Sequence, residues 1–165
     1  MADRDTQAAA TALLDLCKVK KLMVATAESC TGGLVAGALT SVSRSSEVVY
    51  GGFVTYANEA KIAMVGVPYA LLHQFGAVSK DVAVAMAEGA MAAAGTHIAV
   101  AVTGIAGPNG GSKEKPIGLV YFAVATDDQT RHLKKSFDPT WSRDQIRQAS
   151  VIEALKLVQK ALAAI

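Results

Sequence analysis

Ser29 stands at a point in the sequence where a hydroxyl could act as a nucleophile. In "AESCTGG" it follows an apolar run of strand length, and a helical pattern begins with Gly32 and Gly33. The first N–H groups of a helix favour negative charge, so those of Cys30 or Thr31 could stabilise the oxyanion of an attacked carbonyl. The two glycines would let a ligand approach the backbone. With Ser29 as a nucleophile, Thr31 could cap the helix in its place; the alternative is structural, with Ser29 itself as the cap.

A nucleophilic serine needs a base, and Lys61 is the better candidate. It lies three residues after Asn58, the predicted cap of a short helix, where the helix dipole and partial burial would both lower its pKa. The alternative is an exposed lysine paired with Glu59. Tyr56 could relay a proton, hold the lysine, or be an ordinary strand aromatic. A Ser-His-Asp site would need His97 from the wrong end of its strand.

Two neighbours of Ser29 allow other interpretations. A helix N-terminus lowers a thiol pKa, so Cys30 supports a rival cysteine hydrolase, although no histidine partner is evident. Glu28 could orient a ligand amide or pair with a lysine. The three histidines are too scattered to suggest a metal site, so we expect neither a metal nor a cofactor.

A third group of polar residues belongs to the second half of the chain. Arg143 begins a helix, where its guanidinium and the helix N-terminus could bind a phosphate, or where Asp144 merely offsets its charge. The loop "GIAGPNGG" is neither a P-loop nor a dinucleotide-binding motif. Gly104 and Gly107 nevertheless permit close approach of a ligand, and Thr103 presents a hydroxyl at the root of the loop. The alternative is an ordinary mobile loop.

The elements that must position these residues alternate between strand and helix patterns. The sequence predicts strands at 22–27, 48–56, 97–104, 117–126 and 130–137, and helices at 5–20, 32–42, 59–65, 68–76, 80–94 and from a capping box at Ser142 to about 163. This alternation predicts an α/β fold, with residues 1–165 forming a single-domain three-layer α/β/α sandwich, and the hairpin near Asp127 makes the sheet mixed. Ligands bind beyond the carboxyl ends of such strands, so we expect the three polar strand exits to converge.

Composition narrows the class of protein. The chain has 165 residues, of which 52% are hydrophobic, and a net charge of only +2. It has no basic run with interleaved aromatics, so nucleic acid is not an expected partner. No apolar run approaches the ~20 residues of a membrane span, so no membrane partner is expected either. The N-terminus does not resemble a signal peptide, and the two cysteines fit free thiols, which together favour a cytoplasmic location.

Four segments, "AESCTGG", "GGFVTYANEAK", "AVTGIAGPNGG" and "KPIGLVYFAV", closely resemble the CinA C-terminal domain family. The resemblance covers nearly the whole chain. It implies hydrolysis of nicotinamide mononucleotide (NMN) to nicotinate mononucleotide and ammonia, in pyridine nucleotide recycling. It also implies a metal-free α/β/α domain that forms a homodimer or a higher homo-oligomer. Many relatives carry a further N-terminal domain, so this chain is expected to be a stand-alone deamidase.

The resemblance also assigns roles to individual residues. It implies that Ser29 is the nucleophile, that Lys61 is its base and that Tyr56 is a site tyrosine. The expected substrate-binding residues are Thr31, Gly32, Ser46, Thr103, Gly104, Gly107 and Arg143; spacing alone would not have singled out Ser46. Two alternatives stay open: a non-catalytic nucleotide-binding or regulatory domain associated with competence or DNA damage, and an amidase acting on another pyridine or nucleoside amide.

Overall fold

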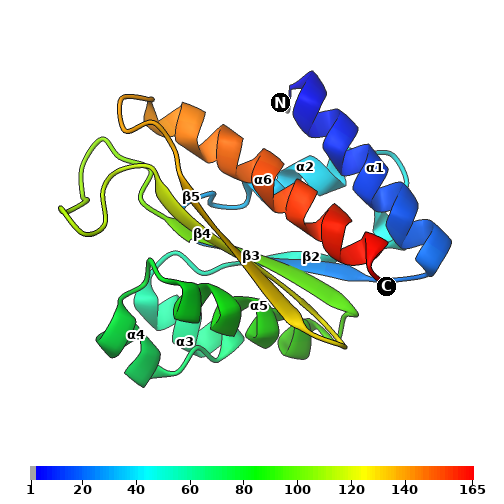
Figure 1. The fold of residues 1–165 in the computed structure, drawn as a ribbon. Helices are drawn as coiled ribbons and strands as arrows, with labels where there is room; N and C mark the ends of the chain where they lie inside the picture. The colour runs from blue at the N-terminus through cyan, green and yellow to red at the C-terminus, as the bar shows by residue number, and fades with distance from the viewer. Residues whose placement is uncertain (1–2) are drawn as a thin grey trace.

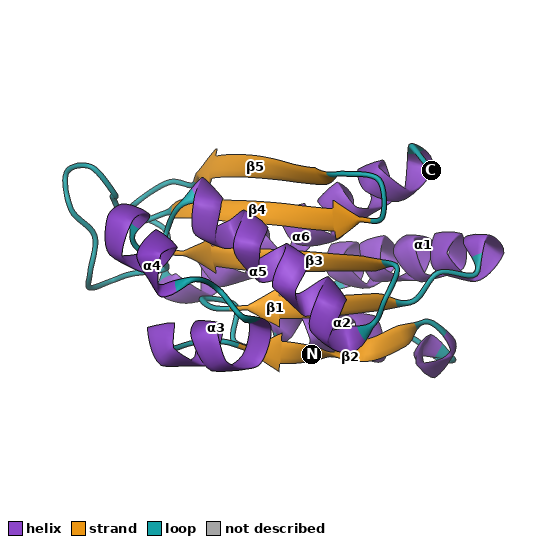
Figure 2. Cartoon of the chain, turned by 90° about the horizontal axis from the view of Figure 1, so that it is seen from below, coloured by secondary structure: helices purple, strands orange, loops and turns teal. Residues whose placement is uncertain are grey.

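Five strands form one mixed sheet in the computed structural model, which describes residues 3–165 (Figure 1). The sheet order is β2-β1-β3-β4-β5. β1 pairs in parallel with both β2 and β3, whereas β4 is antiparallel to β3 and to β5, as Figure 2 shows. The predicted mixed sheet is therefore confirmed. The strands are β1 (Val24–Glu28), β2 (Val49–Val54), β3 (Ile98–Gly104), β4 (Leu119–Thr126) and β5 (Thr130–Ser136).

Helices cover both faces of the sheet, which confirms the predicted three layers (Figure 1). One face carries α1 (Arg4–Lys20), α2 (Leu34–Thr40) and α6 (Arg143–Ala163). The other carries α3 (Asn58–Val65), α4 (Tyr69–Phe75) and α5 (Lys80–Ala94). A 3-10 turn, η1 (Ser45–Glu47), leads into β2. None of the helices within residues 3–165 has the length and apolarity needed to cross a bilayer.

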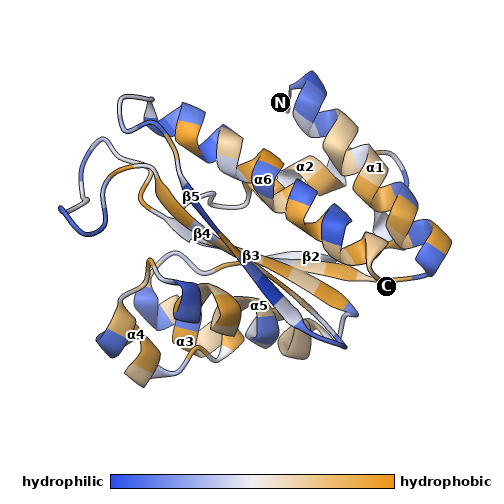
Figure 3. Ribbon diagram, in the orientation of Figure 1, coloured by the Kyte–Doolittle hydropathy of each residue, from blue (hydrophilic) through white to orange (hydrophobic). Residues whose placement is uncertain are grey.

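The two faces of the sheet differ in side-chain size, because side chains alternate along a strand. In β3, Val100 and Val102 pack toward α1 and α6, whereas Ala99 and Ala101 pack toward α5. β4 repeats the pattern, with Phe122 on the first face and alanines on the second. The alanine face lets the alanine-rich α5 lie close to the sheet. Figure 3 shows the central strands coloured hydrophobic and the tip of the long loop after β3 coloured hydrophilic.

The connections create a crevice at the carboxyl ends of β1 and β3. The chain passes from β1 to β2 through α2 on one face, and from β2 to β3 through α3, α4 and α5 on the other face. β1 is followed by β2 on one side of it in the sheet, whereas its neighbour β3 is followed by β4 on the other side. The chain therefore leaves β1 and β3 in opposite directions along the sheet, which marks the topological switch point where open α/β sheets bind ligands.

Two glycines permit close packing next to this crevice. A Cβ on Gly52 would collide with Thr26 Oγ1, and the register of β1 with β2 shifts just before it, so the predicted bulge and close approach are both confirmed. A Cβ on Gly89 of α5 would collide with the main-chain oxygen of Val65, the last residue of α3. Gly89 thus sets how closely α5 can approach the helix that carries Lys61.

The predicted caps of two helices are wrong. The second helix begins at Leu34 rather than at 32, and the predicted cap by Ser29 or Thr31 is wrong. The buried Glu28 carboxylate takes that role, since it accepts hydrogen bonds from the N–H groups of Val35 at 2.9 Å and Ala36 at 3.0 Å. A carboxylate suits this place because helix N-termini favour negative charge.

The predicted cap by Asn58 is also wrong, because Ala57 is the N-cap residue of α3 and Asn58 is its first residue. The reason is that an extended Ala57 already starts the helix, which frees the Asn58 side chain. By contrast, Ser79 caps α5 as predicted, and Ser142 with Gln145 forms the predicted capping box of α6.

Candidate active site

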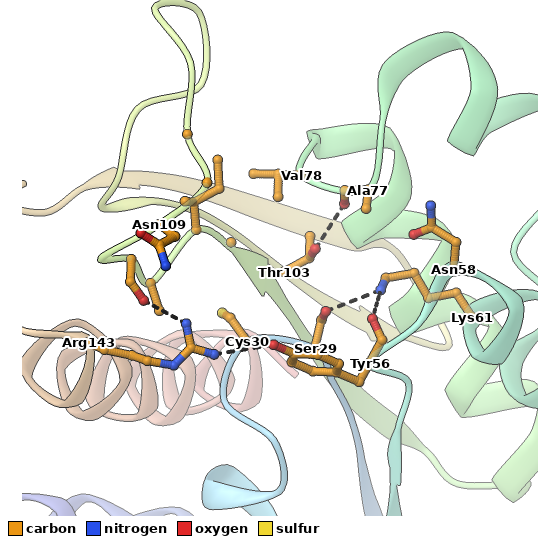
Figure 4. A pocket seen from close by; sticks show the side chains of 16 residues that line it. Ser29, Cys30, Tyr56, Asn58, Lys61, Ala77, Val78, Thr103, Asn109 and Arg143 are labelled. Carbon is orange, nitrogen blue, oxygen red and sulfur yellow. Dashed lines mark hydrogen bonds between the residues drawn. The ribbon is translucent and has the colours of Figure 1, made fainter.

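The three polar strand exits converge on one pocket of about 250 Å³ at the carboxyl ends of β1, β2 and β3 (Figure 4). This confirms the convergence expected from the parallel strands. Seven of the predicted site residues line the pocket: Ser29, Tyr56, Lys61, Thr103, Gly104, Gly107 and Arg143.

Ser29 and Lys61 form a buried pair within this pocket. The Lys61 Nζ lies 3.1 Å from the Ser29 Oγ, although the two residues are 32 positions apart in the chain. Lys61 is only 1% exposed and Ser29 is 9% exposed. The Lys61 Nζ also donates to two main-chain oxygens at the end of β2, those of Thr55 at 2.9 Å and Tyr56 at 3.0 Å.

The three neighbours of Lys61 Nζ suit a neutral amine. A neutral amine has two N–H donors and one lone pair. The two carbonyl oxygens can only accept, so they take the two N–H groups. An ammonium donates to the Ser29 oxygen as well as to these two carbonyls, whereas in the neutral form the lone pair is left for the Ser29 hydroxyl, which can then donate its proton to it. This is the arrangement that a serine with a lysine base requires.

Burial favours that neutral state. It lowers the pKa of the Lys61 amine below its ordinary value, because desolvation disfavours the charged form. The prediction that burial lowers the pKa of this lysine is confirmed. A lower pKa increases the fraction of the amine that is neutral below its ordinary value, and only the neutral amine can accept a proton from the serine.

The turn of residues 29–32, here called the nucleophile turn, carries Ser29 out of β1. The Ser29 N–H donates to the Val102 oxygen at 2.9 Å, and the Ser29 oxygen accepts from the Gly32 N–H at 3.0 Å. Within residues 3–165 the N–H groups of Cys30 and Thr31 have no hydrogen-bond partner. These two groups are the ones expected from the sequence to stabilise an oxyanion.

Arg143 and Tyr56 close one side of the pocket. The guanidinium of Arg143 donates to the Gly107 oxygen at 2.7 Å and to the Tyr56 hydroxyl at 3.2 Å (Figure 4). Tyr56 therefore holds Lys61 through its main-chain oxygen, while its hydroxyl contacts the arginine. Its ring is largely exposed, at 61%.

Thr103 and the glycines after it form another part of the pocket wall. The Thr103 hydroxyl donates to the Ala77 oxygen at 2.9 Å, which ties the end of β3 to the segment between α4 and α5. A Cβ on Gly104 would lie 2.6 Å from a methyl of Val120, so no side chain fits there. Gly107 has a φ of +77°, a conformation that favours glycine.

Three other predicted binding residues do not line the pocket. Thr31 is fully buried, and its hydroxyl has no hydrogen-bond partner among residues 3–165. Gly32 packs against the guanidinium of Arg147. Ser46 lies in η1 at the amino end of β2, whereas the pocket lies at the carboxyl end of that strand. Their roles in binding stay predictions.

Two rival catalytic groups are disfavoured. Burial raises the pKa of the Cys30 thiol to about 12, so the predicted lowering by a helix N-terminus is wrong. The helix begins four residues later, at Leu34, and the thiol is 6% exposed. His97 accepts a hydrogen bond from the Met23 N–H at the opposite end of the sheet. Among residues 3–165 no cluster of three His, Cys, Asp or Glu side chains could hold a metal ion.

Asn58, Asn109 and Arg147 were not predicted as site residues. The two asparagines line the pocket, and Arg147 contacts the nucleophile turn from behind. The only sequence signal for Asn109 is its place in the glycine-rich loop. Arg147 follows Arg143 by one helical turn, and that spacing alone does not indicate what its side chain touches.

The fold and the site together define a three-layer α/β protein with a buried serine–lysine pair at the switch point of its sheet. The chain belongs to the CinA C-terminal domain family, whose sequence model matches residues 6–162. It is 51% identical over 152 residues to a "CinA-like protein" of Geobacter sulfurreducens, and 48% identical over 158 residues to one of Synechococcus. These matches cover 92% and 96% of this chain.

Solved structures of the family agree closely with this fold. The competence/damage inducible protein CihA from Agrobacterium tumefaciens matches with a TM-score of 0.95 at 46% identity, covering 99% of this chain and 98% of that one. A CinA superfamily protein from Escherichia coli matches with a TM-score of 0.91 at 32% identity, covering 98% and 93%. The two curated relatives are longer: the match covers 36% and 38% of their lengths.

Proposed function

We propose that the pocket is the active site of an amidohydrolase that converts NMN to nicotinate mononucleotide and ammonia. The observation that carries this proposal is the buried Lys61 amine 3.1 Å from the Ser29 hydroxyl, with its two N–H groups taken by main-chain oxygens. A serine activated in this way attacks carbonyl compounds. The resemblance to the CinA C-terminal domain family supplies the choice of substrate.

The first half of the reaction makes an acyl-enzyme. The Ser29 oxygen bonds to the carboxamide carbon while its proton moves to the Lys61 amine. The carbonyl oxygen becomes an oxyanion, which the N–H groups of Cys30 and Thr31 stabilise. The Lys61 ammonium then gives its proton to the amide nitrogen, the carbon–nitrogen bond breaks, and ammonia leaves. Lys61 is neutral again at the end of this step.

The second half releases the acid. Water takes the place of ammonia, Lys61 accepts one of its protons, and the resulting hydroxide equivalent attacks the ester carbon. The bond between this carbon and the Ser29 oxygen breaks, and the proton returns from Lys61 to Ser29. The product carries a carboxylate where the substrate carried an amide. No group other than water is consumed in this half.

We assign binding of the nucleotide phosphate to Arg143. A guanidinium has five N–H donors, and only two of those of Arg143 contact protein within residues 3–165. Three donors are thus free for a ligand, at the N-terminus of α6, where the helix dipole favours an anion. Asn58 and Asn109 offer amides to the rest of the ligand from opposite sides of the pocket.

Release of ammonia from NMN by the purified protein tests this function. Ser29→Ala should abolish turnover and leave NMN binding, measured by calorimetry, within a fewfold of the unchanged protein. Cys30→Ala is the matched control on the adjacent residue, and it should stay active. If Ser29→Ala turns over at the full rate, the proposed nucleophile is wrong.

The same assay separates the two alternatives. A regulatory domain, an alternative raised by the names of relatives such as the "Putative competence-damage inducible protein" of Caldicellulosiruptor bescii, would bind the nucleotide without releasing ammonia. An amidase for another substrate would release ammonia faster from nicotinamide riboside or a different pyridine amide than from NMN. Higher kcat/KM for NMN than for these amides is the outcome expected here.

A further inference from the structure

Arg147 holds the nucleophile turn through two main-chain oxygens. Its Nε donates to the Cys30 oxygen at 3.0 Å, and its Nη2 lies 3.4 Å from the Thr31 oxygen. It comes from α6, which is 116 to 117 positions away in the chain. Arg147 does not line the pocket, so it is not placed to touch a substrate.

The contacts of Arg147 fix the direction of an N–H group. The Cys30 oxygen and the Thr31 hydrogen belong to the same planar, trans peptide group, so they point in opposite directions. When the oxygen points at Arg147, the Thr31 N–H points away from Arg147. That N–H is one of the two in the turn that have no partner within residues 3–165.

The charge of Arg147 also strengthens this N–H as a donor. A positive group bound to the oxygen of a peptide withdraws electron density from it, because hydrogen bonds in a chain polarise one another. The interaction of the guanidinium with its other neighbour is weak, because the Asp144 carboxylate lies 3.9 Å away and its side chain is 89% exposed. The two main-chain oxygens are therefore the main partners of Arg147.

Gly32 makes this contact possible. A Cβ at this position would lie 3.2 Å from the Arg147 Nη2, and Gly32 has a φ of +58°. Any larger residue would press against the guanidinium and be strained in this conformation. The glycine is thus explained by close packing with Arg147, with no need for a ligand at this point.

We propose that Arg147 is a positioning residue that orients and polarises the Cys30–Thr31 peptide, so that the Thr31 N–H stabilises the oxyanion formed at Ser29. The inference rests on Ser29 being the nucleophile of the proposed function. Arg147 therefore stabilises the transition state, in which negative charge develops on the carbonyl oxygen, and has little effect on how tightly the substrate binds.

Steady-state kinetics of Arg147→Met and Arg147→Lys test this role. We expect Arg147→Met to lower kcat about ten- to a hundredfold with KM within a fewfold, less than the ~10²–10³-fold loss when an oxyanion donor itself is removed. Lysine keeps the charge but lacks the planar fork of N–H donors that a guanidinium presents, so the kcat of Arg147→Lys should fall between those of the unchanged protein and Arg147→Met. Asp144→Asn is the matched control and should keep the full rate. If Arg147→Met does not fold, the kinetics of Arg147→Lys and the rescue experiment below test the role of Arg147 instead.

Chemical rescue separates positioning from general support of the fold. Guanidinium ion at millimolar concentration should restore part of the kcat of Arg147→Ala, whereas sodium chloride at equal ionic strength should not. A variant with unchanged kcat, or one whose loss lies in KM alone, would overturn the proposal. Equal restoration by both salts would also overturn it.

Labelling of Ser29 by a fluorophosphonate distinguishes this inference from the choice of substrate. The serine oxygen bonds to phosphorus, fluoride leaves, Lys61 accepts the proton, and the phosphoryl oxygen occupies the oxyanion position. If NMN is not hydrolysed but Ser29 is labelled, and Arg147→Met slows the labelling at least tenfold, the inference stands and the proposed substrate fails. Equal labelling rates in both proteins, or no labelling of the unchanged protein, would refute the role of Arg147.

Discussion

Replacement of Lys61 by methionine removes the amine while keeping a side chain of similar length. The two main-chain oxygens of Thr55 and Tyr56 lose their N–H partners, and the Ser29 hydroxyl loses its proton acceptor. Loss of a general base costs about 10²–10⁴-fold in rate. That corresponds to roughly 3–5 kcal/mol of activation free energy at about 1.4 kcal/mol per factor of ten. Lys61→Arg should be as slow, because a guanidinium stays protonated at every accessible pH.

The stability of the same variant depends on pH in a defined direction. Burial lowers the pKa of Lys61 in the folded state below its unfolded value of 10.5. Between those two pKa values the unfolded chain binds a proton that the folded protein does not, so the free energy of unfolding rises with pH. The slope is at most about 1.4 kcal/mol per pH unit for one group. Lys61→Met lacks this contribution.

Two assays measure the pH dependence of the rate and of the stability. Stopped-flow or steady-state rates should show kcat/KM increasing with pH through the lowered pKa of Lys61, since only the neutral amine accepts a proton. Urea unfolding at a series of pH values should show the stability of Lys61→Met relative to the unchanged protein decreasing as pH rises toward 10.5. The two cysteines also titrate at alkaline pH, and both are present in the variant and in the unchanged protein.

A pH-independent rate or a constant stability difference would refute the reasoning about Lys61. The first result would mean that the amine is not the base. The second would mean that Lys61 has the same pKa in the folded and unfolded states, contrary to the effect expected from its burial at 1% exposure. Full activity of Lys61→Met would exclude the serine–lysine mechanism altogether.

Two other changes test how the site is supported. Glu28→Gln removes one of two acceptors for the N–H groups of α2, and we expect a loss of about 2 kcal/mol in urea unfolding, whereas an unchanged midpoint would contradict the capping role. Gly89→Ala forces a methyl group against the Val65 oxygen, so it should cost about 1–3 kcal/mol and lower the rate by shifting α3. Gly37→Ala is the control in another helix, because nothing lies within 4 Å of the new methyl group there. It should raise the free energy of unfolding by about 0.5–1 kcal/mol. Equal effects of the two alanine substitutions would refute the packing argument.

Local sequence signals were sufficient for most of the fold. The alternation of valine with alanine in β3 and β4 fixes which face of the sheet meets which helices. Serine caps at Ser79 and Ser142 start α5 and α6 at the expected residues, because an N-cap bond forms between residues only three apart. The predicted caps at Ser29 and Asn58 were wrong because other residues fill those roles: the Glu28 carboxylate caps α2, and Ala57 is the N-cap residue of α3.

The sequence by itself determined the order of strands and helices, and therefore that Ser29 and Lys61 would leave the sheet at its carboxyl edge. Only the tertiary structure decided that the lysine is buried, that Glu28 caps α2, and that Arg147 reaches the nucleophile turn. The physical reason is the separation along the chain of the residues that interact. Periodicity and capping depend on neighbours in the chain, whereas the pKa of Lys61 and the direction of the Thr31 N–H depend on segments brought together by packing.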